Sequence, residues 1–104
     1  VICRAGALTV AELSAAGLPA IFGPVPAAVD DHQTANARPR VEAGAAEIIQ
    51  QANMTNESLA DILRRFLSDR DALRARARQA RSLAMPDSLL RITNHCLAAA
   101  GATP

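Results

Sequence analysis

Short apolar runs alternate with helical patterns through the first half of the chain. The runs at residues 1–3, 19–22 and 46–49 contain no regular polar alternation and are bounded by glycine or proline. Such runs are typical of strands that are buried on both faces of a parallel sheet. Helical patterns follow the first two runs, over residues 8–16 and 31–43, and Gly17 and Gly44 end them. The pattern therefore predicts an α/β fold with about three short parallel strands. Pro39 predicts a break or kink near Ala37 and Arg38, because proline lacks the helical N–H.

The second half of the chain changes character, because no strand-like run remains after Met54. Thr55 is placed to cap a helix whose apolar positions run to Phe66, and Asp69 or Asp71 is placed to open another that continues to residue 84. A last helix is predicted to begin near residues 86–88, and its apolar face would comprise Leu89, Ile92, Cys96 and Leu97. We therefore divide the chain into a βα portion, residues 1–50, and a helical tail, residues 55–100.

Composition narrows the classes of protein that fit. A chain of 104 residues, half of them apolar, has room for one domain and not for two of ordinary size. It lacks an initiating Met and a leader pattern, so we expect it to start within a larger fold. The net charge of +1 gives no bias towards nucleic acid. Cys3 and Cys96 fit neither a disulfide framework nor a zinc site, and buried, reduced thiols are the simpler expectation.

Candidate chemistry begins at residues 4–12, which follow a strand and open a helix. Doubly wound sheets bind ligands at such positions, beyond the carboxyl ends of their strands. The first-turn N–H groups of Ala7 to Thr9 would lack helical acceptors and so suit a diphosphate, and Gly6 would allow close approach. The Thr9 hydroxyl could donate to phosphate, and the Glu12 carboxylate could accept from ribose hydroxyls. The alternative is a capping box, with Thr9 as the N-cap and Glu12 as its acid.

A second polar cluster lies where the next loop enters the next helix. Its side chains could bind sugar hydroxyls, and they are Asp30, Asp31, His32, Gln33 and Asn36. The alternative makes Asp30 or Asp31 an N-cap with solvated neighbours. A general-base role for His32 lacks an evident orienting partner.

Four arginines, Arg70, Arg74, Arg78 and Arg81, recur at helical spacing in the tail. They could contact phosphate or anionic lipid, but a solvated helix face is the simpler interpretation. Tyr and Trp are absent, so the chain lacks those residues for stacking on bases.

Two stretches resemble the C-terminal domain of the MurG family, transferases that add N-acetylglucosamine to the lipid-linked peptidoglycan precursor. Residues 3–13, continuing through 15–19, resemble the nucleotide-sugar loop and helix of the family. Residues 30–38, with 42–46 behind them, are similar to its sugar-binding stretch. The two motifs in this order are more specific than either alone. The resemblance is strong to about residue 49, and beyond it the chain matches mainly as a helical tail.

The resemblance implies part of the second Rossmann-like domain of a GT-B glycosyltransferase. It would bind UDP-N-acetylglucosamine and take part in transferring N-acetylglucosamine to lipid I, giving lipid II, at the cytoplasmic face of the bacterial plasma membrane. Donor-binding residues would be Ala7, Leu8, Thr9, Val10, Ala11, Glu12 and Gln33. Supporting residues would be Arg4, Gly6, His32 and Asn36. Lipid I and the membrane surface would be contacted through a further, N-terminal domain, and no nucleic acid, metal or cofactor is expected.

Three departures limit what the resemblance implies. Residues 25–29 stand where the family often places an aromatic-containing loop, Pro39 interrupts a helix, and the family's glycine-rich phosphate loop and acceptor domain are missing. We therefore expect no catalytic residue here, and no activity from these 104 residues alone. The alternatives are a related glycolipid transferase with another acceptor and a noncatalytic module that uses the arginine-lined helix.

Overall fold

A three-stranded parallel sheet forms the centre of the computed structural model, which describes residues 1–26 and 31–102. Its strands β1 (Ile2–Cys3), β2 (Ala20–Phe22) and β3 (Ala46–Ile48) lie side by side in chain order. Ile2 pairs with Ile21, and Phe22 pairs in turn with Ile48. The predicted α/β class and the parallel arrangement of three short strands are confirmed.

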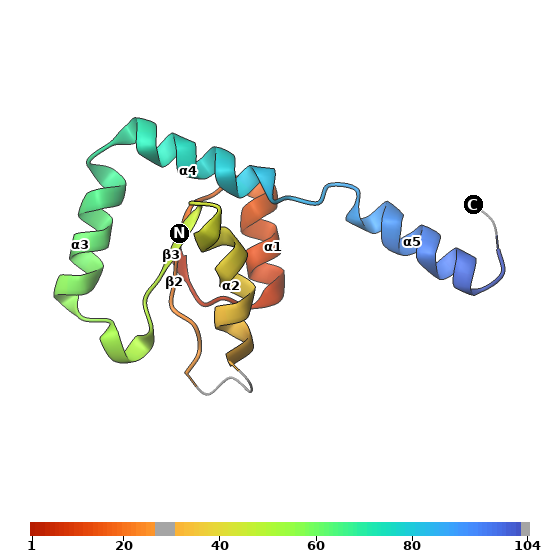
Figure 1. The fold of residues 1–104 in the computed structure, drawn as a ribbon, viewed down its shortest axis with the longest axis horizontal. Helices are drawn as coiled ribbons and strands as arrows, with labels where there is room; N and C mark the ends of the chain where they lie inside the picture. The colour runs from red at the N-terminus through yellow and green to blue at the C-terminus, as the bar shows by residue number, and fades with distance from the viewer. Residues whose placement is uncertain (27–30, 103–104) are drawn as a thin grey trace.

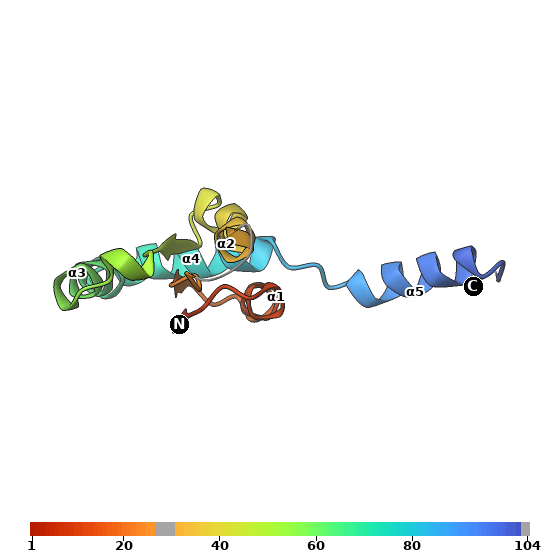
Figure 2. The same ribbon diagram turned by 90° about the horizontal axis from the view of Figure 1, so that it is seen from below.

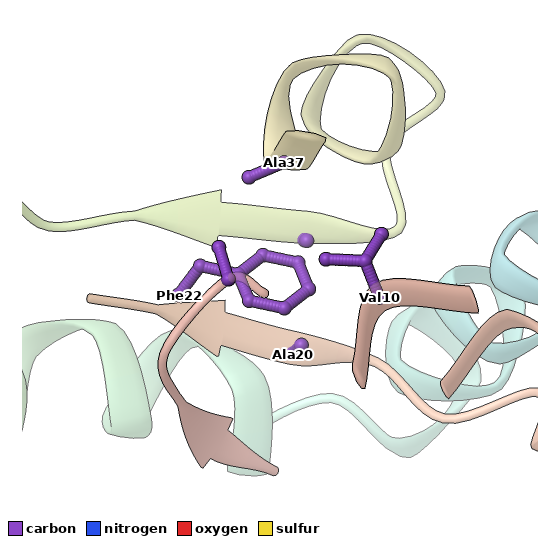
Figure 3. Close-up of a cluster of buried hydrophobic side chains, with 6 residues drawn as sticks. Val10, Ala20, Phe22 and Ala37 are labelled. Atoms are coloured by element: carbon purple, nitrogen blue, oxygen red, sulfur yellow. The ribbon is translucent and has the colours of Figure 1, made fainter. Parts of the chain in front are cut away.

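Helices cover both faces of this sheet, which explains why β1 and β2 are continuously apolar; β3 includes one polar residue, Glu47, which pairs with Arg65 of α3. Helices α1 (Ala7–Ala16) and α2 (His32–Glu42) lie on one side, and α3 (Asn56–Leu67) lies on the other (Figures 1 and 2). Adjacent residues of β2 therefore face different cores. Ala20 and Phe22 pack with Val10 of α1 and Ala37 of α2, as Figure 3 shows, whereas Ile21 packs with residues of α3, among them Ile62 and Phe66.

The predicted end of α1 at Gly17 is correct, whereas the predicted break in α2 near Pro39 is not. Gly17 ends α1 in the left-handed conformation, at φ 68°, and its N–H donates to the carbonyls of Leu13 and Ser14, as predicted. In α2, by contrast, the helix continues through Pro39 to Glu42, so the expected break is wrong. Proline costs the helix one backbone hydrogen bond at that point, and the Pro39 carbonyl still accepts from Ala43 N at 3.1 Å.

The helical tail begins after a short 3-10 helix, η2 (Gln51–Asn53). Thr55 caps α3 through a reciprocal capping box with Ser58, as expected for its position. Of the two candidates to open α4 (Arg70–Ser82), Asp69 is the cap, because its carboxylate accepts from Ala72 N at 3.0 Å. Helix α4 contacts both α3 and α1 and so links the two sides of the molecule (Figure 1).

Helix α5 (Ser88–Ala99) extends away from the rest of the described chain (Figures 1 and 2). The radius of gyration is 16.4 Å, against about 13 Å for a compact domain of this length. The predicted apolar face of α5 is largely in solvent, with Leu89 76% and Ile92 62% exposed. Cys96, expected to be buried, is also exposed, because no element of the described chain covers this face.

Candidate functional site

The carboxyl ends of the three strands meet at one edge of the sheet, where Arg4 joins them. Arg4 follows β1, and its Nη1 donates to the carbonyls of Gly23 (3.1 Å) and Pro24 (3.4 Å), just beyond β2. Its Nη2 donates to Oε1 of Gln51, beyond β3, at 3.0 Å. A guanidinium group has donors in a fixed fork and can serve several acceptors at once. Arg4 therefore holds the loops of this edge together.

Helix α1 begins at this edge without a side-chain cap. Its N-cap is Gly6, in an extended conformation, and the first helical hydrogen bond there runs from Val10 N to Gly6 O at 3.0 Å. The N–H groups of Ala7, Leu8 and Thr9 therefore have no acceptor within the helix. Together with the positive end of the helix dipole, they form a place where an anion is stabilised.

Thr9 and Glu12 are not a capping box, so that alternative is wrong. The N-cap is Gly6 and no side chain caps the helix, which places Thr9 in the first turn itself. Both side chains are exposed, and neither has a hydrogen-bond partner among the described residues. The hydroxyl and the carboxylate are consequently open to a ligand.

Two side chains of α2 reach back to the loop before α1. Gln33 Oε1 accepts from the backbone N–H groups of Ala5 (3.2 Å) and Val25 (3.0 Å), which belong to two different loops. Asn36 Nδ2 donates to the Ala5 carbonyl at 3.0 Å. The two stretches singled out in the sequence are therefore in direct contact.

Known proteins with the same sequence pattern identify the family. The model of the glycosyltransferase family 28 C-terminal domain matches residues 1–92. The chain belongs to this family. It is 54% identical over 100 residues to the UDP-N-acetylglucosamine–N-acetylmuramyl-(pentapeptide) pyrophosphoryl-undecaprenol N-acetylglucosamine transferase of Marinobacter nauticus. It is 52% identical over 101 residues to the transferase of the same name from Methylococcus capsulatus.

A solved structure agrees with these relatives. The crystal structure of Acinetobacter baumannii MurG superposes with a TM-score of 0.83 at 47% identity, over 90% of this chain and 27% of that one. The two curated relatives are matched over 96% and 97% of this chain, but over only 28% of their own length. This family 28 chain thus corresponds to little more than a quarter of each relative.

The predicted donor-binding and supporting residues do not all line the same cavity. A cavity of about 400 Å³ adjoins Cys3, Arg4, Gly23 and Gln51 at the strand ends. One of about 290 Å³ lies between α1 and α2 and is lined by residues that include Ala7 and Asn36. A third, of about 300 Å³, adjoins Ala11 and Glu12, further along α1.

Other predicted residues have different surroundings. Leu8 is 73% exposed, whereas Val10 is only 2% exposed, its N–H donates to Gly6 O, and its side chain lies in the core cluster. Asp31 occupies the N-cap position of α2 without a side-chain cap bond, and Asp30 lies outside the described residues. His32 is exposed at the first residue of α2, and its supporting role in the pocket stays a prediction.

The four arginines that recur at helical spacing in the tail, the arginine stripe Arg70, Arg74, Arg78 and Arg81, have different surroundings. Arg81 in fact donates to the Ala15 carbonyl at the end of α1, and Arg74 lies 3.9 Å from Asp71. Arg76, outside the stripe, stacks over the Phe66 ring at 4.4 Å. At least one of the four arginines therefore contacts another part of the fold. This weakens the hypothesis that the four form one continuous surface for an anionic partner.

The half-buried Cys3 thiol has its pKa raised by burial, an effect partly offset by the nearby N-terminal ammonium group. A thiol whose pKa is raised is mostly protonated at neutral pH and is a poor nucleophile. Within residues 1–26 and 31–102, no three His, Cys, Asp or Glu side chains are grouped as a metal would need. Over the same residues, no helix combines the length and apolarity needed to cross a bilayer.

Proposed function

We propose that this chain is the donor-binding part of an inverting transferase. The enzyme moves N-acetylglucosamine from UDP-N-acetylglucosamine to the C4 hydroxyl of the muramoyl sugar of lipid I and so gives lipid II. The observation that carries the proposal is the uncapped start of α1 at the carboxyl edge of the sheet. The Marinobacter and Methylococcus relatives support the proposal, because their shared name states this donor and this kind of acceptor.

Residues at the start of α1 bind the donor in this proposal. The N–H groups of Ala7, Leu8 and Thr9, with the Thr9 hydroxyl, donate to the diphosphate and the sugar. The exposed Glu12 carboxylate, one helical turn further along, accepts from both ribose hydroxyls. Ala11 flanks this contact. Gln33 Oε1 is occupied by two backbone N–H groups, so its Nε2 group is the part that serves a sugar hydroxyl.

The chemistry assigned to this part of the enzyme is stabilisation of the leaving group. The acceptor oxygen bonds to C1 of the sugar as the bond from C1 to the UDP oxygen breaks, which inverts C1. Negative charge then grows on the diphosphate, where unpaired N–H groups and the helix dipole stabilise it. The acceptor proton passes to a base outside these 104 residues, so no catalytic residue is assigned here. Arg4, Gly6, His32 and Asn36 support the pocket, and no metal is required.

The remaining parts of the proposal concern the two portions of the chain and the rest of the enzyme. Residues 1–50 provide the donor site, and residues 55–100 form a helical tail. The complete enzyme binds lipid I and the inner membrane surface through an N-terminal domain, peripherally and on the cytoplasmic face. Nucleic acid is not a partner, and residues 1–104 alone have no transferase activity.

A chimera provides the test, because the chain is little more than a quarter of each relative. Residues 1–104 replace the matching segment of the Marinobacter transferase, and calorimetry measures binding of UDP-N-acetylglucosamine. Conversion of a lipid I analogue to the lipid II analogue is followed with radiolabelled donor. We expect donor binding and product formation. A folded chimera that binds no donor would overturn the proposal, as would lipid II formation by the isolated chain.

A further inference from the structure

The peptide groups on the two sides of Ala5 are held by side chains of a different element. Its N–H donates to Gln33 Oε1 at 3.2 Å, and its carbonyl accepts from Asn36 Nδ2 at 3.0 Å. Gln33 and Asn36 are three residues apart on α2 and therefore project from the same face of that helix. Ala5 itself is completely buried. Residue 5 thus has little freedom to rotate.

The position of Ala5 makes its hydrogen bonds to Gln33 and Asn36 important for the site. Ala5 directly precedes Gly6, the N-cap of α1, which has no side chain and no side-chain cap bond. Glycine constrains the backbone less than any other residue. The direction in which the N–H groups of Ala7 and Leu8 point is therefore set by what holds Ala5, rather than by the cap.

Gln33 also accepts from a second loop, through Val25 N at 3.0 Å, whereas the Asn36 side chain is hydrogen-bonded only to Ala5 among the described residues. Asn36 also lines the 290 Å³ cavity between α1 and α2, next to Ala7. A change at Asn36 is thus the cleaner perturbation. It releases the Ala5 carbonyl without disturbing the β2–α2 loop.

We propose that Asn36 is a positioning residue for donor binding: it holds the Ala5 carbonyl so that the first-turn N–H groups of α1 face the diphosphate. This inference rests on the proposed function, since it assumes that a nucleotide diphosphate binds at α1. It assigns to Asn36 an effect on donor affinity without contact to the donor.

The test uses three variants in the chimera described above. Asn36→Ala removes the donor group. Asn36→Asp keeps the shape, but its ionised carboxylate cannot donate and would repel the Ala5 carbonyl. Thr34→Val is the matched control on the same helix, because it removes a hydroxyl that donates to Asp31 Oδ1 at 2.7 Å and accepts from Gln50 Nε2 at 3.1 Å. Donor affinity, KM, kcat and Tm are measured for each.

The two Asn36 variants are expected to raise the Kd for UDP-N-acetylglucosamine about fivefold or more at pH 7.5, the effect of losing one ordinary hydrogen bond. Thr34→Val should leave it within about twofold even where Tm falls equally. Asn36→Asp should regain affinity as the pH is lowered towards about 4, near the ordinary pKa of aspartic acid, because a protonated carboxyl can donate to Ala5 again. Asn36→Ala should show no such recovery.

The outcomes separate this inference from the proposed function. If the unmodified chimera folds but binds no donor, the proposed function fails, and this inference fails with it. If the chimera binds donor and the Asn36 variants bind it as tightly, only the positioning role is overturned. An affinity loss that follows Tm alike in all three variants, without pH recovery in Asn36→Asp, also overturns it and leaves a purely structural Asn36.

Discussion

Replacing Glu12 with alanine should weaken donor binding without weakening the fold. The side chain is exposed, caps nothing and has no hydrogen-bond partner among the described residues. Exposed substitutions away from such features change stability by no more than about 0.5 kcal/mol. A hydrogen bond to a charged group contributes about 1.5 kcal/mol at the low end of its range, which suits an exposed site. Loss of one ribose contact then raises Kd about tenfold, and loss of both about 100-fold.

The assay compares two ligands as well as two proteins. Calorimetry on the chimera measures the Kd of UDP and of its 2′-deoxy counterpart, and thermal melting measures stability. The unmodified chimera should prefer UDP, whereas Glu12→Ala should lose most of that preference, because the carboxylate that reads the 2′-hydroxyl is gone. Glu42→Ala, also exposed on a helix, makes the same change in net charge and serves as the control. Equal Kd values for Glu12→Ala and the unmodified chimera would refute the ribose contact. So would a loss that leaves the preference for UDP intact.

Three further predictions concern the fold. Gly17→Ala should destabilise the chimera by about 1 kcal/mol, because φ is 68° there while an added Cβ meets only ordinary contacts at 3.5 and 3.6 Å; an unchanged Tm would contradict this. Cys3 should be alkylated more slowly than the exposed Cys96 at pH 7, because its raised pKa leaves little thiolate, and the Cys3 rate should increase as the pH rises. Mass spectrometry measures the rate at both sites, and equal rates would count against this prediction. The isolated chain should self-associate or unfold, because Val1, Ile2 and Leu18 leave apolar surface beside β1; a monodisperse monomer with a cooperative melt would show otherwise.

Much of the fold could be predicted, because each strand lies in a short, mainly apolar run bounded by turn residues. The prediction held to within a residue at Phe22 and Ile48, and Gly17 ended its helix where expected. Helix α5 shows the limit of this reasoning. Its amphipathic pattern predicts that Leu89 and Ile92 are covered, but a pattern does not say by what, and both are exposed. Pro39 shows another limit, since one missing hydrogen bond was too small a cost to end α2.

The candidate site was located from sequence, but its internal contacts were not. Spacing alone left Thr9 and Glu12 open to a capping box, because a glycine N-cap leaves no side-chain signal. The hydrogen bond between Gln33 and Ala5 joins residues 28 positions apart in the chain, and it forms only because α2 packs against the loop before α1. The contact of Arg81 with Ala15 likewise depends on where α4 crosses α1.

The opposite orientation of Ile21 and Phe22 has a consequence for how such a chain can change over time. Phe22 belongs to the cluster that supports α1 and α2, and Ile21 belongs to the cluster that supports α3. Substitutions that repack the α3 side must be accommodated around Ile21 and need not move Phe22. The tail can therefore diverge, exchanging one set of side chains for another, while the half of the molecule that carries the proposed donor pocket keeps its geometry.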